Sequence, residues 1–167
     1  MQGDSCGFYA DLLAVLKARA DAGFKARAAA RVKAIAAEGV GRREQAARLA
    51  AEPGVTGEIN PHHLCAKLVK ALGPSGVVIN EAIRNIPTVL AQMPRTEPGT
   101  LVGLAGAGLG CSASVALGLK LAMPDRIVMP IMGDGTFYFS NPQSVLAVSQ
   151  KYGLPIFTVV LDNSGWG

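Results

Sequence analysis

The chain has 167 residues, of which 50% are hydrophobic and 17% are charged, a composition that is typical of a folded α/β or helical protein and excludes a disordered one. Its net charge of +4 is concentrated at one end, because residues 1–50 contain nine Lys and Arg against five Asp and Glu, whereas residues 51–167 contain seven of each. These basic residues are scattered among alanines at helical spacing without aromatic residues between them, which favours a solvated helix face, so no nucleic acid is expected as a partner.

The first part of the chain is predicted to be helical. Residues 9–51 are rich in Ala, Leu, Arg and Lys and contain few β-branched residues. Gly39 and Gly41 are expected to divide this region into two helices. The stretch AEPGVTGEINP then brings together two prolines and two glycines, which is typical of a linker. We therefore predict residues 1–56 to be a helical segment with a linker, and residues 57–167 to be a second domain.

The second domain is predicted to alternate helices and strands. Asn60 followed by Pro61 is the pattern of a helix N-cap with proline at the first helical position, so a helix is expected from there to Leu72. The apolar runs GVVIN, RIVMPIM and PIFTVVLD are predicted strands, with helices over residues 83–93 and 141–152. An extended entry, a glycine loop and a further helix are expected within LVGLAGAGLGCSASVALGLKLAMPD. This alternation predicts an α/β fold in which a parallel sheet has helices on both faces.

Cysteine usage and the N-terminus favour a cytoplasmic location. Cys6, Cys65 and Cys111 form an odd, widely separated set without a C-x-x-C pair. The N-terminus lacks the basic and then apolar pattern of a signal peptide. A reducing cytosol is therefore expected.

One uncharged segment is long enough to raise the question of a membrane span. Residues 101–119 contain no charged side chain, but they include five glycines, two serines and a cysteine, so their hydrophobicity is weak. The segment leads directly into a predicted strand of the second domain. A buried loop and helix are therefore expected, and no membrane partner.

Polar residues stand at the ends of two predicted strands. Asp134, flanked by Gly133 and Gly135, follows one strand, and Asp162-Asn163 follows the next. Ligands of such sheets bind beyond the carboxyl ends of the strands. A carboxylate and an amide oxygen suit Mg²⁺ or Ca²⁺, and Mg²⁺ commonly completes its shell with phosphate oxygens and water. Asp134 and Asn163 therefore predict a metal ion that holds a phosphorylated cofactor. Gly133 and Gly135 would let backbone N–H groups approach a phosphate closely, and Thr136 could add a hydroxyl contact.

These motifs resemble those of a known enzyme family. The sequence GDG, followed after 26 residues by DN, resembles the thiamine diphosphate-binding motif of the acetolactate synthase, benzoylformate decarboxylase and pyruvate decarboxylase family. VVINEAIRN and the glycine-rich stretch from PGTLVGLAG to AMPDR are similar to the same family's diphosphate-binding domain. The first 50 residues resemble the tail of its central domain and a linker. The resemblance implies a thiamine diphosphate- and Mg²⁺-dependent lyase or transferase that decarboxylates or carboligates 2-oxo acids, as a homodimer or homotetramer in its full-length form.

The resemblance also implies roles for individual residues. Asp134, the side chain of Asn163 and the backbone carbonyl of Gly165 would ligate Mg²⁺ together with diphosphate oxygens and water. Leu109 matches the bulky residue that wedges between the two cofactor rings and bends the cofactor, so that its 4′-amino group lies beside the thiazolium C2 proton. The implied cofactor-binding residues are Ala107, Gly108, Leu109, Gly133, Gly135 and Thr136.

The sequence departs from the family pattern in several places. The family often has Asn-Asn where this chain has Asp162-Asn163, the spacing of the motif is slightly long, and Cys111 makes the glycine loop more polar. The family's activating glutamate lies in an N-terminal pyrimidine-binding domain, normally of a second subunit, and Glu81 is not its equivalent. We therefore expect this chain to be a fragment of a larger enzyme, to hold no catalytic residue of its own and to be inactive alone.

Other interpretations remain open. Gly106, Gly108 and Gly110 resemble a dinucleotide fingerprint whose third glycine is one position early, so a nucleotide-binding α/β domain is one alternative, and a non-catalytic assembly module is another.

A second metal site and a role for one arginine are also considered. His62, His63 and Cys65 are candidate metal ligands, but adjacent histidines near a helix start point apart and a fourth ligand is not evident. Arg84 is expected either to meet the diphosphate or to form a surface salt bridge.

Overall fold

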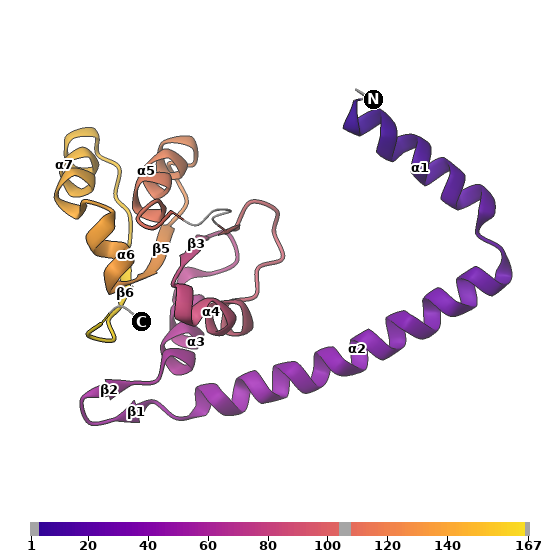
Figure 1. Ribbon diagram of the computed structural model, residues 1–167, viewed down its shortest axis with the longest axis horizontal. Coiled ribbons are helices and arrows are strands. Elements are labelled where there is room, and N and C mark those ends of the chain that lie inside the picture. Colours follow the sequence, from indigo (N-terminus) through magenta and orange to yellow (C-terminus); the bar gives the residue numbers. More distant parts are fainter. Residues whose placement is uncertain (1–3, 104–107, 166–167) are drawn as a thin grey trace. The chain divides into compact units, whose positions relative to one another are not determined.

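The computed structural model describes residues 4–103 and 108–165 (Figure 1). The chain divides into two compact units, Met1–Glu44 and Gln45–Gly167. The first unit is helical, and neither of the two helices that begin in it has a buried residue. These helices are α1 (Ser5–Arg19) and α2 (Ala22–Ala51).

The expected division at Gly39 and Gly41 is wrong, because α2 runs through both glycines without interruption. The break lies instead before Ala22, where the Asp21 carboxylate accepts a hydrogen bond from the Phe24 N–H at 2.6 Å and so caps the new helix. A glycine within a helix costs only about 1 kcal/mol relative to alanine. A helix as long as α2 can carry two of them.

The last turns of α2 belong to the second unit. The Asn60 side-chain amide donates to the carbonyl oxygens of Leu49 and Glu52, each at 2.8 Å, and the Gln92 amide donates to the Ala46 carbonyl at 2.7 Å. These bonds explain why the two units divide before residue 56. The assignment of residues 1–56 and 57–167 as functional domains stays a prediction.

The predicted linker contains a small hairpin. Strands β1 (Gly54–Val55) and β2 (Glu58–Ile59) pair antiparallel. Gly54 has a φ of +116°, and a Cβ atom placed on it would lie 2.2 Å from the Glu58 carbonyl oxygen. Only glycine fits this close approach of two backbones.

The second unit contains a four-stranded parallel sheet, as predicted. Its strand order is β4-β3-β5-β6, and every neighbouring pair is parallel. The two central strands are almost entirely buried, which matches their continuous apolar sequences. The strands are β3 (Val77–Glu81), β4 (Leu101–Gly103), β5 (Val128–Gly133) and β6 (Val159–Leu161).

Helices cover both faces of this sheet, which confirms the predicted α/β fold (Figure 1). On one face, Cys65 and Val89 from the helices pack with Val78 and Ile131 from the strands. On the other face, Ala116 packs with strand residues that include Ile79. The helical elements are α3 (Pro61–Leu72), the 3₁₀ turn η1 (Ile83–Asn85), α4 (Ile86–Gln92), α5 (Ser112–Ala122), α6 (Asp134–Phe139) and α7 (Pro142–Tyr152).

Local sequence signals fix some of these boundaries closely. The Asn60 side chain accepts a hydrogen bond from the His62 N–H at 2.9 Å, so α3 begins with the predicted cap and proline, and it ends at Leu72 as expected. The helix α6, by contrast, was not predicted as a separate element.

The last strand is shorter than the predicted PIFTVVLD, and Pro130 in β5 explains the difference. Successive residues of a strand direct their N–H groups to opposite neighbours, and the Val128 carbonyl accepts from the Phe157 N–H at 2.9 Å on the β6 side. Residue 130 faces the same side but has no N–H to donate. The regular pairing of β5 with β6 therefore begins only at Ile131 and Val159.

Within residues 4–103 and 108–165, no helix is both long enough and apolar enough to cross a bilayer.

Candidate functional site

The carboxyl ends of three strands meet at one edge of the sheet. Glu81 at the end of β3 pairs with Met132, and Gly133 at the end of β5 pairs with Leu161 at the end of β6. The segments that follow these strands therefore begin side by side, at the edge where parallel α/β sheets bind ligands.

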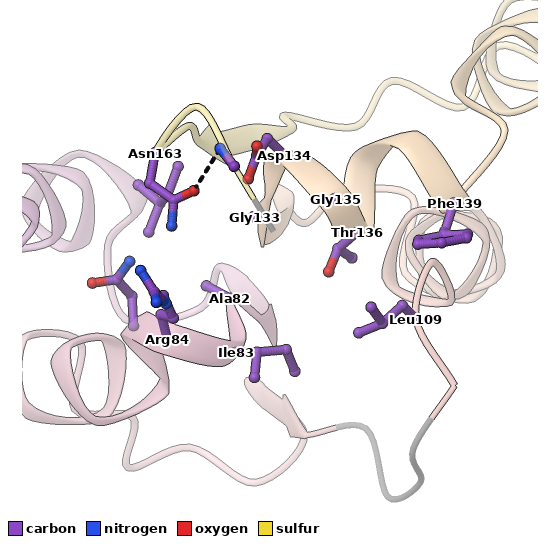
Figure 2. A pocket seen from close by; sticks show the side chains of 13 residues that line it. Ala82, Ile83, Arg84, Leu109, Gly133, Asp134, Gly135, Thr136, Phe139 and Asn163 are labelled. Carbon is purple, nitrogen blue, oxygen red and sulfur yellow. Dashed lines mark hydrogen bonds between the residues drawn. The ribbon is translucent and has the colours of Figure 1, made fainter. Parts of the chain in front are cut away.

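A cavity of about 220 Å³ lies at this edge (Figure 2). Of the nine predicted site residues, Gly108 does not line the cavity and Ala107 lies outside the described residues. The structure thus brings together residues from two strand ends and the glycine loop, although their roles stay predictions. The predicted residues that line the cavity are Leu109, Gly133, Asp134, Gly135, Thr136, Asn163 and Gly165.

Asp134 provides the only carboxylate among the described residues that line the cavity. It is the first residue of α6, immediately after β5, and its side chain is half-buried. In the described part of the chain, it forms no ion pair with a lysine or arginine. A partly buried negative charge without a protein counter-charge is suited to binding a cation.

Asn163 and Gly165 lie in a loop that contains two turns, in each of which a side-chain oxygen accepts a hydrogen bond from the N–H two residues later. The Asn163 Oδ1 accepts a hydrogen bond from the Gly165 N–H at 3.2 Å, drawn as the dashed line in Figure 2. In the same loop, the Asp162 carboxylate accepts from the Ser164 N–H at 2.7 Å, and Ser164 has a φ of +60°. The amide oxygen of Asn163 keeps a second lone pair that can bind a cation.

Thr136 already has a partner within the protein. Its side chain is buried, and its hydroxyl donates to the Glu81 carbonyl oxygen at 3.4 Å. A diphosphate oxygen only accepts hydrogen bonds, so the hydroxyl must give up this long bond in order to donate to a diphosphate.

The glycine loop is held against the end of α6. Gly110 has a φ of +94°, and a Cβ atom placed on it would lie 2.6 Å from the Phe139 carbonyl carbon and 2.7 Å from the Ser140 nitrogen. The preceding residue, Leu109, is 44% exposed and lies at the cavity opposite Thr136 and Phe139 (Figure 2). The loop thus presents an apolar side chain to the cavity from a tightly packed turn.

Arg84 lines the cavity, and Figure 2 shows its side chain pointing toward the loop that carries Asn163. Of the two roles considered for it, the surface salt bridge is not observed among the residues that the structure describes. Contact of Arg84 with the diphosphate stays a prediction.

Several lining residues could not be found from the sequence. They carry no charge, and no role was predicted for any of them, although Ala82, Ile83 and Asn85 lie within the family-like stretch VVINEAIRN. The segment from the end of β3 through η1, the end of α6 and the end of β6 bring them to the cavity only in the folded chain. These residues are Ala82, Ile83, Asn85, Phe139 and Leu161.

The second candidate metal site is not formed. His62 Nδ1 lies 3.1 Å from the Gln92 amide nitrogen, and His63 Nδ1 lies 2.9 Å from the Ala50 carbonyl oxygen. Burial raises the pKa of the Cys65 thiol to about 11, so it stays protonated at neutral pH and is a poor metal ligand. Among the described residues, no three His, Cys, Asp or Glu side chains are grouped to hold a metal ion.

The sequence matches a protein-family model over residues 83–167, and that family is described as "Thiamine pyrophosphate enzyme, C-terminal TPP binding domain". Similar curated proteins include an acetolactate synthase of Mycobacterium leprae, which is 28% identical over 120 residues, or 71% of this chain and 19% of the relative. A benzoylformate decarboxylase of Pseudomonas aeruginosa is 28% identical over 101 residues, or 60% of this chain and 19% of the relative.

Solved structures show the same likeness. The thiamine diphosphate-dependent 4-hydroxybenzoylformate decarboxylase of Rhodococcus jostii RHA1 aligns with 68% of this chain and 21% of its own, at a TM-score of 0.63 and 26% identity. The chain thus spans about a fifth of the length of these relatives.

Proposed function

We propose, on the basis that this chain belongs to the family of thiamine pyrophosphate enzymes, that it forms the diphosphate-binding half of an active site that acts on 2-oxo acids. The observation that carries the proposal is the arrangement of Asp134, Asn163 and Gly165 around one cavity at the ends of β5 and β6. The chemistry that thiamine diphosphate supplies when bound is stabilisation of a carbanion.

The residues at the cavity fit a Mg²⁺-diphosphate group. A carboxylate, an amide oxygen and a backbone carbonyl are hard oxygen ligands, and three of them leave positions for diphosphate oxygens and water. Gly133 and Gly135 have no side chains that would keep a phosphate from the backbone. Arg84, which lines the same cavity, adds a positive charge.

The size of the cavity supports a half-site. Pockets for small molecules and cofactors typically measure about 300–1,000 Å³, and this one is smaller. We propose that the aminopyrimidine half, with its activating glutamate, comes from a further domain in a homodimer or homotetramer. On this proposal the isolated 167-residue chain binds diphosphate but does not turn over substrate.

The reaction type is proposed from the relatives. Acetolactate synthase, benzoylformate decarboxylase and 2-hydroxyacyl-CoA lyase are among the proteins similar to this chain. We propose an acetolactate synthase-like lyase or transferase, because the acetolactate synthase alignment covers the largest share of this chain among these three. Both decarboxylation and carboligation are included in this proposal.

The test is a binding titration of the full-length protein that carries this chain. Thiamine diphosphate is expected to bind in the presence of Mg²⁺ and to be released by a chelator, and the loaded protein is expected to consume a 2-oxo acid such as pyruvate. Titration with NAD is the control for a nucleotide-binding domain. Tighter binding of NAD, or no metal-dependent binding of thiamine diphosphate, would contradict the proposal.

Leu109→Ala is expected to reduce turnover more than cofactor binding. The metal ligands and Arg84 remain in this variant, but the cofactor loses the side chain that would fix its bent geometry, and a misplacement of about 1 Å can cost about 100-fold in rate. Measurement of kcat and of the dissociation constant for thiamine diphosphate separates the two effects. Leu146→Ala, which removes an exposed leucine of α7, is the matched control. If binding weakened while turnover per bound cofactor held, Leu109 would be an ordinary packing residue.

A further inference from the structure

We propose that Glu81 is a positioning residue that holds the glycine loop, and through it Leu109, in the place that the cofactor requires. The proposal rests on the proposed function of the cavity. It concerns a carboxylate that does not itself line the cavity and is only 2% exposed.

The Glu81 carboxylate accepts three backbone hydrogen bonds from the loop. Its Oε1 accepts from the Gly110 N–H at 3.0 Å and from the Cys111 N–H at 3.2 Å, and its Oε2 accepts from the Ser112 N–H at 2.8 Å. These donors lie at or just before the start of α5, where N–H groups have no partner within the helix. Both carboxylate oxygens are therefore committed to this one turn of backbone.

The helix has no cap of its own. Cys111 stands at the N-cap position of α5, and its side chain makes no capping hydrogen bond. Residues such as Ser, Thr, Asp and Asn usually supply this bond from within the same turn. Here the Glu81 carboxylate at the end of β3 instead accepts from the N–H of Ser112, the first residue of α5, and its negative charge also favours the positive end of the helix dipole.

Three contacts fix the same region from different sides. Gly110 packs on the backbone of Phe139 and Ser140, and the Thr136 hydroxyl donates to the Glu81 carbonyl oxygen at 3.4 Å. The carboxylate thus ties the loop to the sheet, while the backbone of the same residue contacts α6. Leu109 directly precedes this anchored turn and extends into the cavity.

Loss of the carboxylate should loosen the loop without touching the metal ligands. Asp134 and Asn163 follow other strands, so the diphosphate would stay bound. Leu109 would lose its fixed position, and the cofactor would therefore lose its bent geometry. Glu81 therefore acts on cofactor orientation and not on diphosphate affinity.

The experiment uses the full-length protein with Glu81→Gln. A glutamine at this position has only one acceptor oxygen. Its NH₂ group is a donor, so at least one of the three backbone N–H groups would face another donor and lose its hydrogen bond. Amide hydrogen exchange over residues 110–112 is expected to accelerate at least about 10-fold, even without cofactor. With thiamine diphosphate and Mg²⁺ bound, exchange of the cofactor C2 proton with deuterated water is expected to slow about 10- to 100-fold, whereas the dissociation constant changes less.

Gln92→Ala is the control for a merely structural role. Gln92 is also buried in the second unit, and its amide donates to the Ala46 carbonyl at 2.7 Å, away from the glycine loop. This variant is expected to lower the melting temperature without changing C2 exchange. If Glu81→Gln slowed C2 exchange no more than Gln92→Ala, the positioning role would be wrong.

A double-mutant cycle tests whether Glu81 acts through Leu109. The effects of Glu81→Gln and Leu109→Ala on C2 exchange are expected to be strongly non-additive, because both remove the same constraint. Additive effects would overturn the proposal. If Glu81→Gln does not fold, Glu81→Asp replaces it, and its shorter carboxylate is expected to give an intermediate loss of exchange rate.

The wild-type protein alone also provides a test, because unprotected amides at residues 110–112 would contradict the anchoring. Failure of the proposed function is seen separately, as an absence of Mg²⁺-dependent thiamine diphosphate binding by the wild type.

Discussion

Asp134→Ala is expected to abolish Mg²⁺-dependent retention of thiamine diphosphate. Asp134 carries the only carboxylate among the described residues at the cavity, so the variant leaves a hard cation with neutral oxygen ligands alone. Loss of even an outer-shell partner of a metal ligand typically weakens metal affinity by about 10- to 100-fold, so removal of a direct ligand should exceed that range.

The measurement is a calorimetric titration of the full-length protein with thiamine diphosphate, once in the presence of Mg²⁺ and once in the presence of a chelator. Asp125→Ala is the matched control, since Asp125 is an exposed aspartate in the turn between α5 and β5. The control should bind the cofactor as the wild type does. Unchanged affinity in Asp134→Ala would remove the metal site from this edge of the sheet.

Gly110→Ala is expected to destabilise the protein and to displace the glycine loop from α6. The φ of +94° disfavours any residue with a Cβ atom, which costs on the order of 1–3 kcal/mol. The new methyl group would also lie 2.6–2.7 Å from the backbone of Phe139 and Ser140, so the loop must move away from α6. That movement breaks the bond from the Gly110 N–H to Glu81 as well.

Gly118→Ala is the control for this prediction. Gly118 lies within α5, is exposed, and has open space on the side where a Cβ atom would project, with no neighbouring atom within 4 Å. Alanine there should raise the free energy of unfolding by about 0.4–1 kcal/mol. Denaturant unfolding of both variants gives the comparison, and equal stabilities would show that the Gly110 turn is not constrained.

Much of the fold could be predicted because its signals are local. Asn60 and Pro61 begin a helix through contacts within one turn, and the apolar runs of β3 and β5 are continuous because both strands are buried on both faces. The errors have two different causes. Pro130 shortens a strand that lies far later in the sequence, which is a non-local effect. The helix α2 continues through Gly39 because one glycine costs a long helix only about 1 kcal/mol.

The candidate site could be predicted only where a motif marks it. Asp134 and Asn163 stand at strand ends, and parallel strands bring such ends to one edge. No role was predicted for Phe139 or Ile83, and they reach the cavity only through the packing of α6 and η1. The role of Glu81 is hidden for the same reason, because its partner Cys111 is 30 residues away in the sequence.

The cap on α5 also has a consequence for the order in which the chain folds. The N–H groups of Gly110, Cys111 and Ser112, which lead into α5, donate to Glu81 at the end of β3, so these bonds form only after a loop of about 30 residues has closed. Helices with a cap in their own sequence can form their first turn before any tertiary contact. We therefore expect the glycine loop to assemble late in folding. A substitution in β3 that delays the packing of α5 on the sheet should delay the assembly of the loop as well.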